Sequence, residues 1–238
     1  MEDITPKNKT KSYKLFDQIA ETYDFLNILL SLGIDRLWRK KIVKILKGET
    51  IEDALDMATG TGDMAILLAK DTSSKRVEGI DLSKEMISIG NKKVKNQNLD
   101  HKCELKIGDG VSIPYPDSSQ DLITITFGIR NFPDFKESMR NMFRVLRPGG
   151  KAVVMEFSLP KNILVRKFYL LYFRYILPLI GNLISGHKNA YTYLNQTVEE
   201  FPYGETFANH FKEAGFEKVD IHPLTFGIAS IYVAEKSK

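Results

Sequence analysis

A glycine-rich segment at 56–63, Asp-Met-Ala-Thr-Gly-Thr-Gly-Asp, has the residue types and spacing of a nucleotide-binding turn. Its centre, Gly60-Thr61-Gly62, follows a predicted strand and opens a predicted helix. Glycine lets the backbone bend sharply there and approach a flat ligand without an intervening side chain. Together with Ala65, the spacing also satisfies the dinucleotide fingerprint. The turn alone therefore does not distinguish one nucleotide cofactor from another.

Carboxylates around this turn favour S-adenosyl-L-methionine as the cofactor. Asp56 ends the strand before the turn and Asp63 follows the turn; carboxylates suit ammonium and sulfonium groups and repel a pyrophosphate. Asp81 ends the next predicted strand, where it can accept hydrogen bonds from both ribose hydroxyls of either cofactor. Asp109 follows the third strand and is placed to bracket an adenine edge. The predicted cofactor-binding residues are Asp56, Gly60, Thr61, Gly62, Asp81, Leu82, Asp109, Gly110 and Thr126.

Purely structural explanations compete with this interpretation. Glycines after a strand often form only a turn, and Asp81 or Asp109 alone would more often cap a helix or lie in a solvated loop. Asp56 could instead neutralise a nearby cation. Binding is favoured because the acids fall at the carboxyl ends of successive strands, where open sheets bind ligands. A nicotinamide oxidoreductase is the weaker alternative.

Short apolar segments that alternate with amphipathic ones must position these residues, a pattern typical of a parallel sheet with helices on both faces. We predict strands near 54–57, 76–80, 103–107, 122–126, 152–157, 218–225 and 228–235. Helices are predicted at 63–70, 83–95, 135–146 and 203–214, with Ser83 and Asp63 as candidate caps. The whole resembles a class I S-adenosylmethionine methyltransferase: an α/β, Rossmann-like, mainly parallel sheet with an antiparallel strand at its C-terminal edge.

We expect residues 1–238 to form one domain. Apolar residues recur at helical spacing between 14 and 47, so residues 1–48 are predicted to form an N-terminal helical lid. Residues 51–158 are predicted to be the cofactor-binding core, and 159–200 an insertion that faces the substrate or a membrane. Residues 203–238 complete the core.

Composition argues against several classes of protein. The net charge of +4, from 34 basic and 30 acidic residues, lacks the concentrated excess of a nucleic-acid binder. The single cysteine, Cys103, excludes an internal disulfide, and the four histidines show no metal-ligand spacing, so no metal is expected. The first 14 residues have no apolar core of the kind found in signal peptides. These features predict a cytoplasmic protein.

Longer motifs are spread along nearly the whole chain: Phe16-Asp-Gln-Ile-Ala20, Tyr23-Asp-Phe-Leu-Asn27, Leu30-Ser-Leu-Gly33, Trp38-Arg39, Thr126-Phe-Gly-Ile-Arg-Asn131, Arg144-Val-Leu-Arg-Pro-Gly-Gly150, Glu156-Phe-Ser158, Tyr191-Thr-Tyr-Leu194, Phe201-Pro202 and Ala214-Gly-Phe216. Together they resemble the ubiquinone and menaquinone biosynthesis C-methyltransferases, the UbiE/MenG family. General methyltransferases share the Pro-Gly-Gly turn but lack the first and last of these motifs. Three departures, at Ile129, Thr197 and the pair Gly110 with Tyr115, bear on substrate preference more than on activity, because none changes the charge of a predicted site.

The resemblance implies S-adenosylmethionine-dependent carbon methylation of a polyprenylated quinol. The product is menaquinol from demethylmenaquinol, the 3-methyl product of 2-polyprenyl-6-methoxy-1,4-benzoquinol, or both. Arg130 would stabilise a phenolate, since guanidinium stays protonated and cannot be the base, while Asn131 orients the same ring. Tyr23, Asp24 and Phe127 would line the substrate site.

Each of these roles has an alternative. Arg130 could merely bridge acids such as Asp134, and Tyr23 with Asp24 could belong to a helix packed over the sheet with its acids in solvent. The whole chain could be a non-catalytic Rossmann-like membrane or assembly module of the quinone pathway. Such a module would tolerate Arg130→Ala.

The segment 161–188 interleaves basic and aromatic side chains. A prenyl tail needs an apolar channel, and basic groups beside aromatic ones suit an anionic membrane surface, here the inner face of the membrane. Breaks in the apolar run 168–184 argue against a transmembrane helix. A subunit interface of a homodimer, or simple cover for the core, remains open. The residues concerned are Lys161, Arg166, Lys167, Arg174 and Lys188, among Phe168, Tyr169, Leu170, Leu171, Tyr172, Phe173 and Tyr175.

Overall fold

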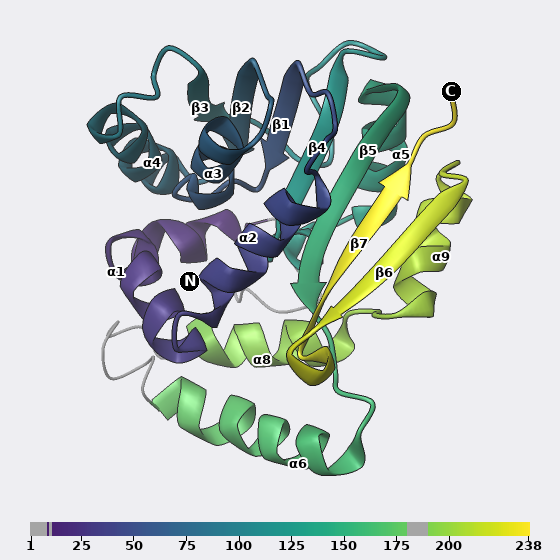
Figure 1. The fold of residues 1–238 in the computed structure, drawn as a ribbon. Helices are drawn as coiled ribbons and strands as arrows, with labels where there is room; N and C mark the ends of the chain where they lie inside the picture. The colour runs from purple at the N-terminus through teal and green to yellow at the C-terminus, as the bar shows by residue number, and fades with distance from the viewer. Residues whose placement is uncertain (1–8, 10, 180–189) are drawn as a thin grey trace.

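The computed structural model describes residue 9, residues 11–179 and residues 190–238, and these contain a seven-stranded sheet of order β3-β2-β1-β4-β5-β7-β6 (Figure 1). Strands β1 to β5 pair in parallel, whereas β7 is antiparallel to both β5 and β6. The predicted α/β fold is confirmed, although the antiparallel strand lies one place in from the edge, which β6 occupies. The strands are β1 (Asp53–Met57), β2 (Arg76–Asp81), β3 (Cys103–Ile107), β4 (Gln120–Thr126), β5 (Leu146–Phe157), β6 (Lys218–Leu224) and β7 (Ala229–Glu235).

Helices bury both faces of this sheet. Leu122 of β4 packs into one apolar cluster, while its neighbours Ile123 and Ile125 pack into another on the opposite face. The first cluster includes side chains of α2 (Ile34–Ile45), α3 (Asp63–Asp71) and α4 (Lys84–Asn96). The second includes α5 (Phe135–Val145) and α9 (Glu205–Glu213). With both faces covered, a ligand finds room at the carboxyl ends of the strands.

Local sequence determines where the helices beside these strand ends begin. Helix α4 follows Ser83, whose hydroxyl accepts a hydrogen bond from the Met86 amide at 3.2 Å. The prediction that Ser83 caps this helix is therefore confirmed. The suggestion that Asp63 caps α3 is wrong. Helix α3 begins at Asp63 itself, directly after Gly62 in the left-handed region (φ +81°), and the Asp63 carboxylate pairs with Lys93 instead.

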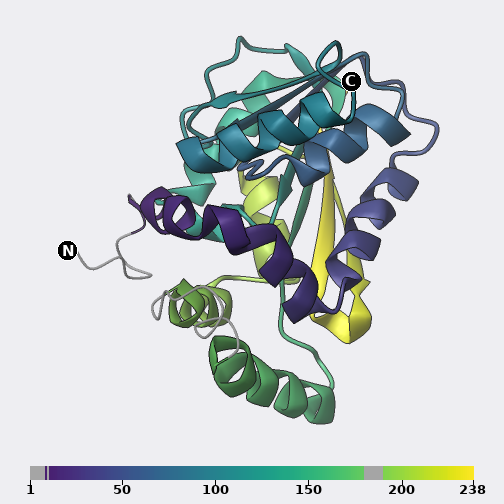
Figure 2. The same cartoon turned by 90° about the vertical axis from the view of Figure 1, so that its left-hand side faces the viewer.

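Helix α1 (Tyr13–Ser31) lies across the carboxyl ends of the strands, as Figures 1 and 2 show together. The α6 helix (Ile163–Leu171), the π-helical turn η2 (Tyr172–Ile176) and α8 (Ala190–Glu200) form a further layer beyond it, with α6 farthest from the sheet (Figure 1). Buried side chains of these helices, with Leu159 from the connection after β5 and Leu177 directly after η2, make a third apolar cluster, separate from the two sheet cores: Leu15, Ile19, Leu26, Leu159, Tyr169, Phe173, Leu177, Tyr193 and Val198.

Gly128 follows β4 at a very close approach between two strand ends. A Cβ at this position would lie 2.4 Å from the Cβ of Ala58. We expect Gly128→Ala to lower the free energy of unfolding by about 1–3 kcal/mol, because a tightly packed interior must shift to admit the methyl group. Urea unfolding measures this loss.

Ala58 provides a matched control, because its φ of +49° lies in the region that glycine adopts readily. The double variant Gly128→Ala/Ala58→Gly removes the clash and should recover most of the lost stability. A double variant as unstable as the single one would show that the close approach is not the cause.

Candidate active site

A cavity, here called the strand-end cavity, opens where β1, β2 and β4 end and is covered by α1. Six of the nine predicted cofactor-binding residues line it: Gly60, Asp81, Leu82, Asp109, Gly110 and Thr126. The other lining residues are Lys9, Ser12, Tyr13, Phe16, Tyr23, Ala58, Met86, Gly108, Val111, Phe127, Gly128, Asn131, Phe132 and Pro133. The cavity therefore carries two carboxylates, Asp81 and Asp109, and one cation, Lys9, among apolar and neutral polar residues.

Asp81 connects the glycine turn at Gly60 to the turn that precedes α4 at Ser83. Its Oδ2 accepts a hydrogen bond from the Gly60 amide and its Oδ1 from the Ser83 amide, both at 2.9 Å. Loss of hydration raises the pKa of the Asp81 carboxyl, and the backbone donors oppose that rise. Each carboxylate oxygen has a further lone pair, so Asp81 can also accept hydrogen bonds from ligand hydroxyls.

Asp56 lies beneath the glycine turn and does not line the cavity. Its two oxygens accept hydrogen bonds from the hydroxyls of Thr59 and Thr124, each at 2.6 Å. Burial raises the pKa of Asp56 to about 6. Because side chains alternate along a strand, Asp56 points away from the face that buries Leu55 and Met57 and supports the turn from within.

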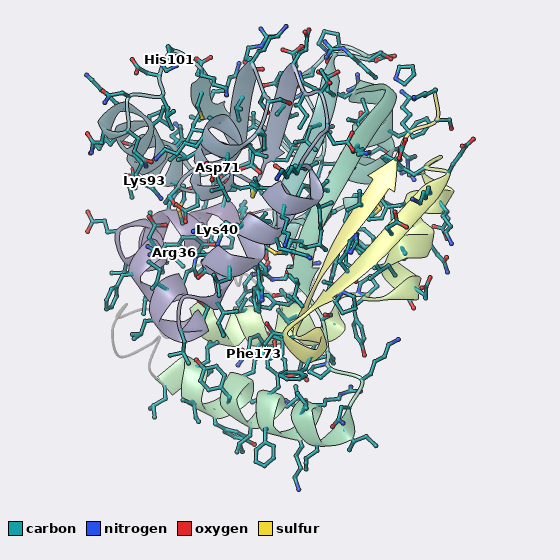
Figure 3. The ribbon with its side chains drawn as sticks, in the orientation of Figure 1. Arg36, Lys40, Asp71, Lys93, His101 and Phe173 are labelled. Atoms are coloured by element: carbon teal, nitrogen blue, oxygen red, sulfur yellow. The ribbon has the colours of Figure 1, made fainter. Side chains whose placement is uncertain are left out.

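The predicted residues Thr61 and Asp24 also lie outside the cavity lining, where they fasten α1 to the glycine turn. Asp24 accepts hydrogen bonds from the Thr61 hydroxyl at 2.6 Å and from Lys93 at 2.9 Å. Lys93, labelled in Figure 3, extends from α4 and also pairs with Asp63. Seven residues before Asp24, Asp17 accepts a hydrogen bond from the Ser83 hydroxyl at 2.6 Å. Two carboxylates of α1 therefore anchor this helix over the strand ends.

Gly62, the last of the nine, packs against β3 instead of lining the cavity. A Cβ on Gly62 would lie 2.6 Å from Cδ1 of Leu105. The glycine is needed for close packing and for its left-handed φ.

A second cavity, here called the apolar cavity, lies between α1, α2 and the α6, η2 and α8 layer. Its volume of about 520 Å³ exceeds the 160 Å³ of the strand-end cavity. Apolar and aromatic side chains predominate, among them Phe173, which Figure 3 labels between α6 and the sheet. The lining is Leu15, Phe16, Ile19, Tyr23, Asn27, Leu29, Ser31, Leu32, Ile34, Asp35, Trp38, Arg39, Phe127, Arg130, Phe157, Tyr169, Tyr172, Phe173, Leu177, Tyr193, Leu194, Thr225 and Ile228.

Three aromatic residues, Phe16, Tyr23 and Phe127, line both cavities. Phe127 has a φ of +60°, uncommon for an aromatic residue, and its ring stacks on Phe157 with centroids 4.5 Å apart. Strained backbone of this kind persists where the surroundings enforce it, often at functional sites. Burial raises the pKa of the Tyr23 hydroxyl. The two cavities therefore meet at these rings.

Arg130 and Asn131 are neighbours on the short helix η1 (Ile129–Asn131), yet they line different cavities. Arg130 lines the apolar cavity and Asn131 the strand-end cavity. The Asn131 Oδ1 atom is buried without a hydrogen-bond partner among the described residues. The two side chains were predicted to act on one ring; the structure instead places them on either side of the junction.

Arg130 is 5% exposed and forms a buried ion pair. Its Nη1 donates to Oε1 of Glu156 at 2.8 Å and to the carbonyl of Phe127 at 2.5 Å. Asp134, the acid suggested as an alternative partner, instead caps α5 by accepting from the Glu137 amide. Glu156 and the Phe127 carbonyl therefore fix the guanidinium, whose centre lies 5.5 Å from the ring centroid of Phe157.

Sequence reasoning assigned no role to several residues at the two cavities. Glu156 and Arg39 lie within motifs quoted in the sequence analysis, and this membership is the sequence feature that could have pointed to them. Tyr169 was recognised only as an aromatic residue of the insertion. Within the described ranges, no group of His, Cys, Asp and Glu is arranged to hold a metal ion, and none of the helices is long and apolar enough to span a bilayer.

The model of the ubiE/COQ5 methyltransferase family matches residues 4–236. The chain belongs to this family. The demethylmenaquinone methyltransferase of Chlorobaculum parvum is 43% identical over 237 residues, which cover 98% of this chain and 95% of that protein. The ubiquinone/menaquinone biosynthesis C-methyltransferase UbiE of Geotalea daltonii is 43% identical over 234 residues, covering 98% and 99%.

A solved structure supports the fold assignment independently of this family. It is a Thermotoga maritima S-adenosylmethionine-dependent methyltransferase described as a possible histamine N-methyltransferase. Its TM-score is 0.67 at 18% identity, and the match covers 94% of this chain and 99% of that chain. At this identity the likeness concerns the fold alone, because one fold supports many reactions.

Proposed function

We propose that this protein of the ubiE/COQ5 methyltransferase family transfers a methyl group from S-adenosyl-L-methionine to a ring carbon of a polyprenylated quinol. The proposed reactions are demethylmenaquinol to menaquinol, and the corresponding step on 2-polyprenyl-6-methoxy-1,4-benzoquinol. The observation that carries the proposal is the junction at Phe127, where an acidic strand-end cavity meets a larger apolar one that holds Arg130. The relatives' names support a quinol as the substrate.

The strand-end cavity suits S-adenosyl-L-methionine, which supplies an electrophilic methyl group on a sulfonium. Asp81 can accept hydrogen bonds from the ribose hydroxyls. Leu82, Met86 and Phe132 offer apolar surface to the adenine beside Asp109. The unpartnered Oδ1 of Asn131 provides a buried acceptor in the same cavity. Thr126 and Gly60 complete the walls near the junction.

The apolar cavity suits the quinol and the first part of its tail. The ring would stack at Phe127, while side chains of α1 and α6 surround the prenyl chain. Burial of this apolar surface supplies binding free energy of roughly 25 cal/mol per Å². The same enclosure keeps water from the reacting carbon and methyl group.

Arg130 acts on the ring oxygen next to the reacting carbon. Ionisation of that hydroxyl, which gives its proton to solvent, raises the electron density at the carbon, whose electron pair forms the new bond to the methyl carbon. The bond from methyl to sulfur breaks and its electron pair stays on sulfur. The ring carbon then gives its proton to solvent, the electron pair of that C–H bond restores the aromatic ring and the phenolate, and the phenolate takes up a proton again. Arg130 stays protonated and stabilises the phenolate, held in place by Glu156.

The direct test is incubation with methyl-labelled S-adenosyl-L-methionine and each demethyl quinol in turn, followed by identification of the product. We expect label on a ring carbon of at least one lipid, with release of S-adenosylhomocysteine. Label on a small hydrophilic phenol and on neither lipid would contradict the proposed substrate.

We further propose that the outer face of α6 and η2 rests on an anionic membrane surface. Five exposed apolar side chains recur every three or four residues along this segment: Leu164, Phe168, Leu171, Tyr175 and Leu179, each at least 54% exposed. The opposite face, with Tyr169, Phe173 and Leu177, is buried against the apolar cavity. A helix that is apolar on both sides needs a second apolar neighbour.

Basic side chains support a lipid surface as that neighbour. Lys161, Arg166 and Lys167 are exposed on the same segment, and cations beside an apolar stripe favour anionic headgroups. Arg174 is engaged in an ion pair with Glu199, and Lys188 lies outside the described residues. The α6 helix would then lie between the bilayer and the apolar cavity, so a quinol dissolved in the bilayer would enter the cavity beside α6.

The double variant Phe168→Ser/Leu171→Ser is expected to bind anionic liposomes at least about 10-fold more weakly, because each side chain loses apolar burial. Co-sedimentation measures the binding, and activity on a short-chain quinol should be unchanged. Leu37→Ser, at another exposed leucine (64%), is the matched control. Unaltered liposome binding combined with conversion of a dimer to a monomer would identify the face as a subunit interface.

A further inference from the structure

Arg39, on α2, is a second buried guanidinium in the apolar cavity, and its environment resembles that of Arg130. It is 8% exposed, and its Nη1 donates to Oδ2 of Asp35 at 2.5 Å. Asp35 also accepts a hydrogen bond from the Ser31 hydroxyl at 2.8 Å. Among the described residues, the Nε atom of Arg39 has no hydrogen-bond partner, and the same is true of Nε of Arg130.

The two arginines flank one aromatic wall. The guanidinium of Arg39 lies 5.8 Å from the ring centroid of Phe127, and that of Arg130 lies 5.5 Å from the centroid of Phe157. The two phenylalanine rings stack on each other at 4.5 Å, and Trp38 packs against both. A flat ring bound at this wall would therefore have a guanidinium available on either side.

The pair of Arg39 with Asp35 does not by itself explain why Arg39 is buried. Pairs spaced i,i+4 contribute little to stability, whereas burying a guanidinium is favourable only when most of its donors have partners. Arg39 has five N–H donors and donates one hydrogen bond among the described residues. An oxygen acceptor inside the cavity would use the remainder.

We infer that Arg39 is a substrate-positioning residue that donates a hydrogen bond to the second oxygen of the quinol ring, para to the oxygen held at Arg130. The inference rests on the proposed function. A 1,4-quinol carries two oxygens on opposite sides of a flat ring, which matches two guanidiniums flanking one aromatic wall. Holding both oxygens fixes the rotation of the ring and hence which carbon faces the methyl group.

The test compares Arg39→Met with the wild type on the quinol and on a prenylated analogue that keeps only the ring oxygen next to the reacting carbon. For the quinol we expect KM to rise about 10- to 100-fold in the variant, the usual effect of losing a hydrogen bond to a charged group. For the analogue without the distal oxygen, wild type and variant should be nearly equal. Arg39→Lys, which keeps one charge and a donor, should recover part of the loss.

Two further measurements separate the alternatives. The Kd of S-adenosylhomocysteine should be the same for Arg39→Met and the wild type, since Arg39 does not line the strand-end cavity. A weakened Kd would assign Arg39 to the cofactor and overturn the inference. The variant Arg39→Met/Asp35→Asn removes both buried charges, so equal unfolding temperatures with a raised KM exclude misfolding as the cause.

Equal losses on the quinol and on the analogue without the distal oxygen would also overturn the inference while leaving the proposed function intact. A wild-type protein that methylates none of the quinols would instead overturn the proposed function, and the inference with it.

Discussion

Replacing Arg130 with methionine is expected to lower kcat for the quinol about 100- to 1,000-fold, with a smaller change in KM. Removing one preorganised donor from a developing negative charge typically has an effect of this size. Arg130 is 2.8 Å from Glu156 and lines the apolar cavity beside the ring of Phe157. Steady-state rates with labelled cofactor measure the loss.

Stability must be separated from catalysis in this experiment. Arg130→Met leaves the carboxylate of Glu156, which is 1% exposed, without its partner, and breaking a buried pair in this way costs about 3–5 kcal/mol. The double variant Arg130→Met/Glu156→Gln removes both charges and should regain stability without regaining activity. Recovery of kcat in the double variant would mean that the single variant had only lost its fold.

Replacing Asp81 with asparagine is expected to raise the Kd of S-adenosylhomocysteine roughly 10- to 100-fold. Hydrogen bonds to a charged group contribute about 1.5–3 kcal/mol. The amide also turns one of its N–H groups toward either the Gly60 or the Ser83 donor, both of which the carboxylate accepts at 2.9 Å. Isothermal titration calorimetry measures the change in affinity.

Asp121 offers a matched control for this variant. Its carboxylate likewise accepts two backbone hydrogen bonds, from Glu52 and Asp53 at 2.8 and 2.9 Å, but it does not line the strand-end cavity. Asp121→Asn should lower stability without weakening binding. Equal losses of affinity in both variants would show that Asp81 acts only by holding the backbone at Gly60 and Ser83, and not by contacting the ligand.

The sequence predicted the strand-end cavity well because its residues follow a local rule. Asp81, Asp109 and Thr126 each come at or just after the carboxyl end of a strand, and parallel strands end at the same edge of the sheet. Asp56 is the instructive case. Its place in the chain was predicted, but strand alternation directs its side chain beneath the turn.

The apolar cavity could not be predicted in the same way, because its walls come from segments far apart in the chain. Arg39 and Tyr169 line one cavity only after α1, α2 and α6 have packed, and Glu156 contributes by pairing with Arg130. Two of these three residues, Arg39 and Glu156, lie within motifs recognised in the sequence. The spacing of the motifs does not predict which side chains these residues contact in the fold.

Helix α1 carries Phe16 and Tyr23, the rings shared by both cavities, and is held by the carboxylates of Asp17 and Asp24. Displacing this one helix would open the strand-end cavity and the apolar cavity in the same movement, because its side chains form part of both walls. If the two reactants bind as proposed, access to the cofactor and access to the lipid would therefore be controlled by the same helix.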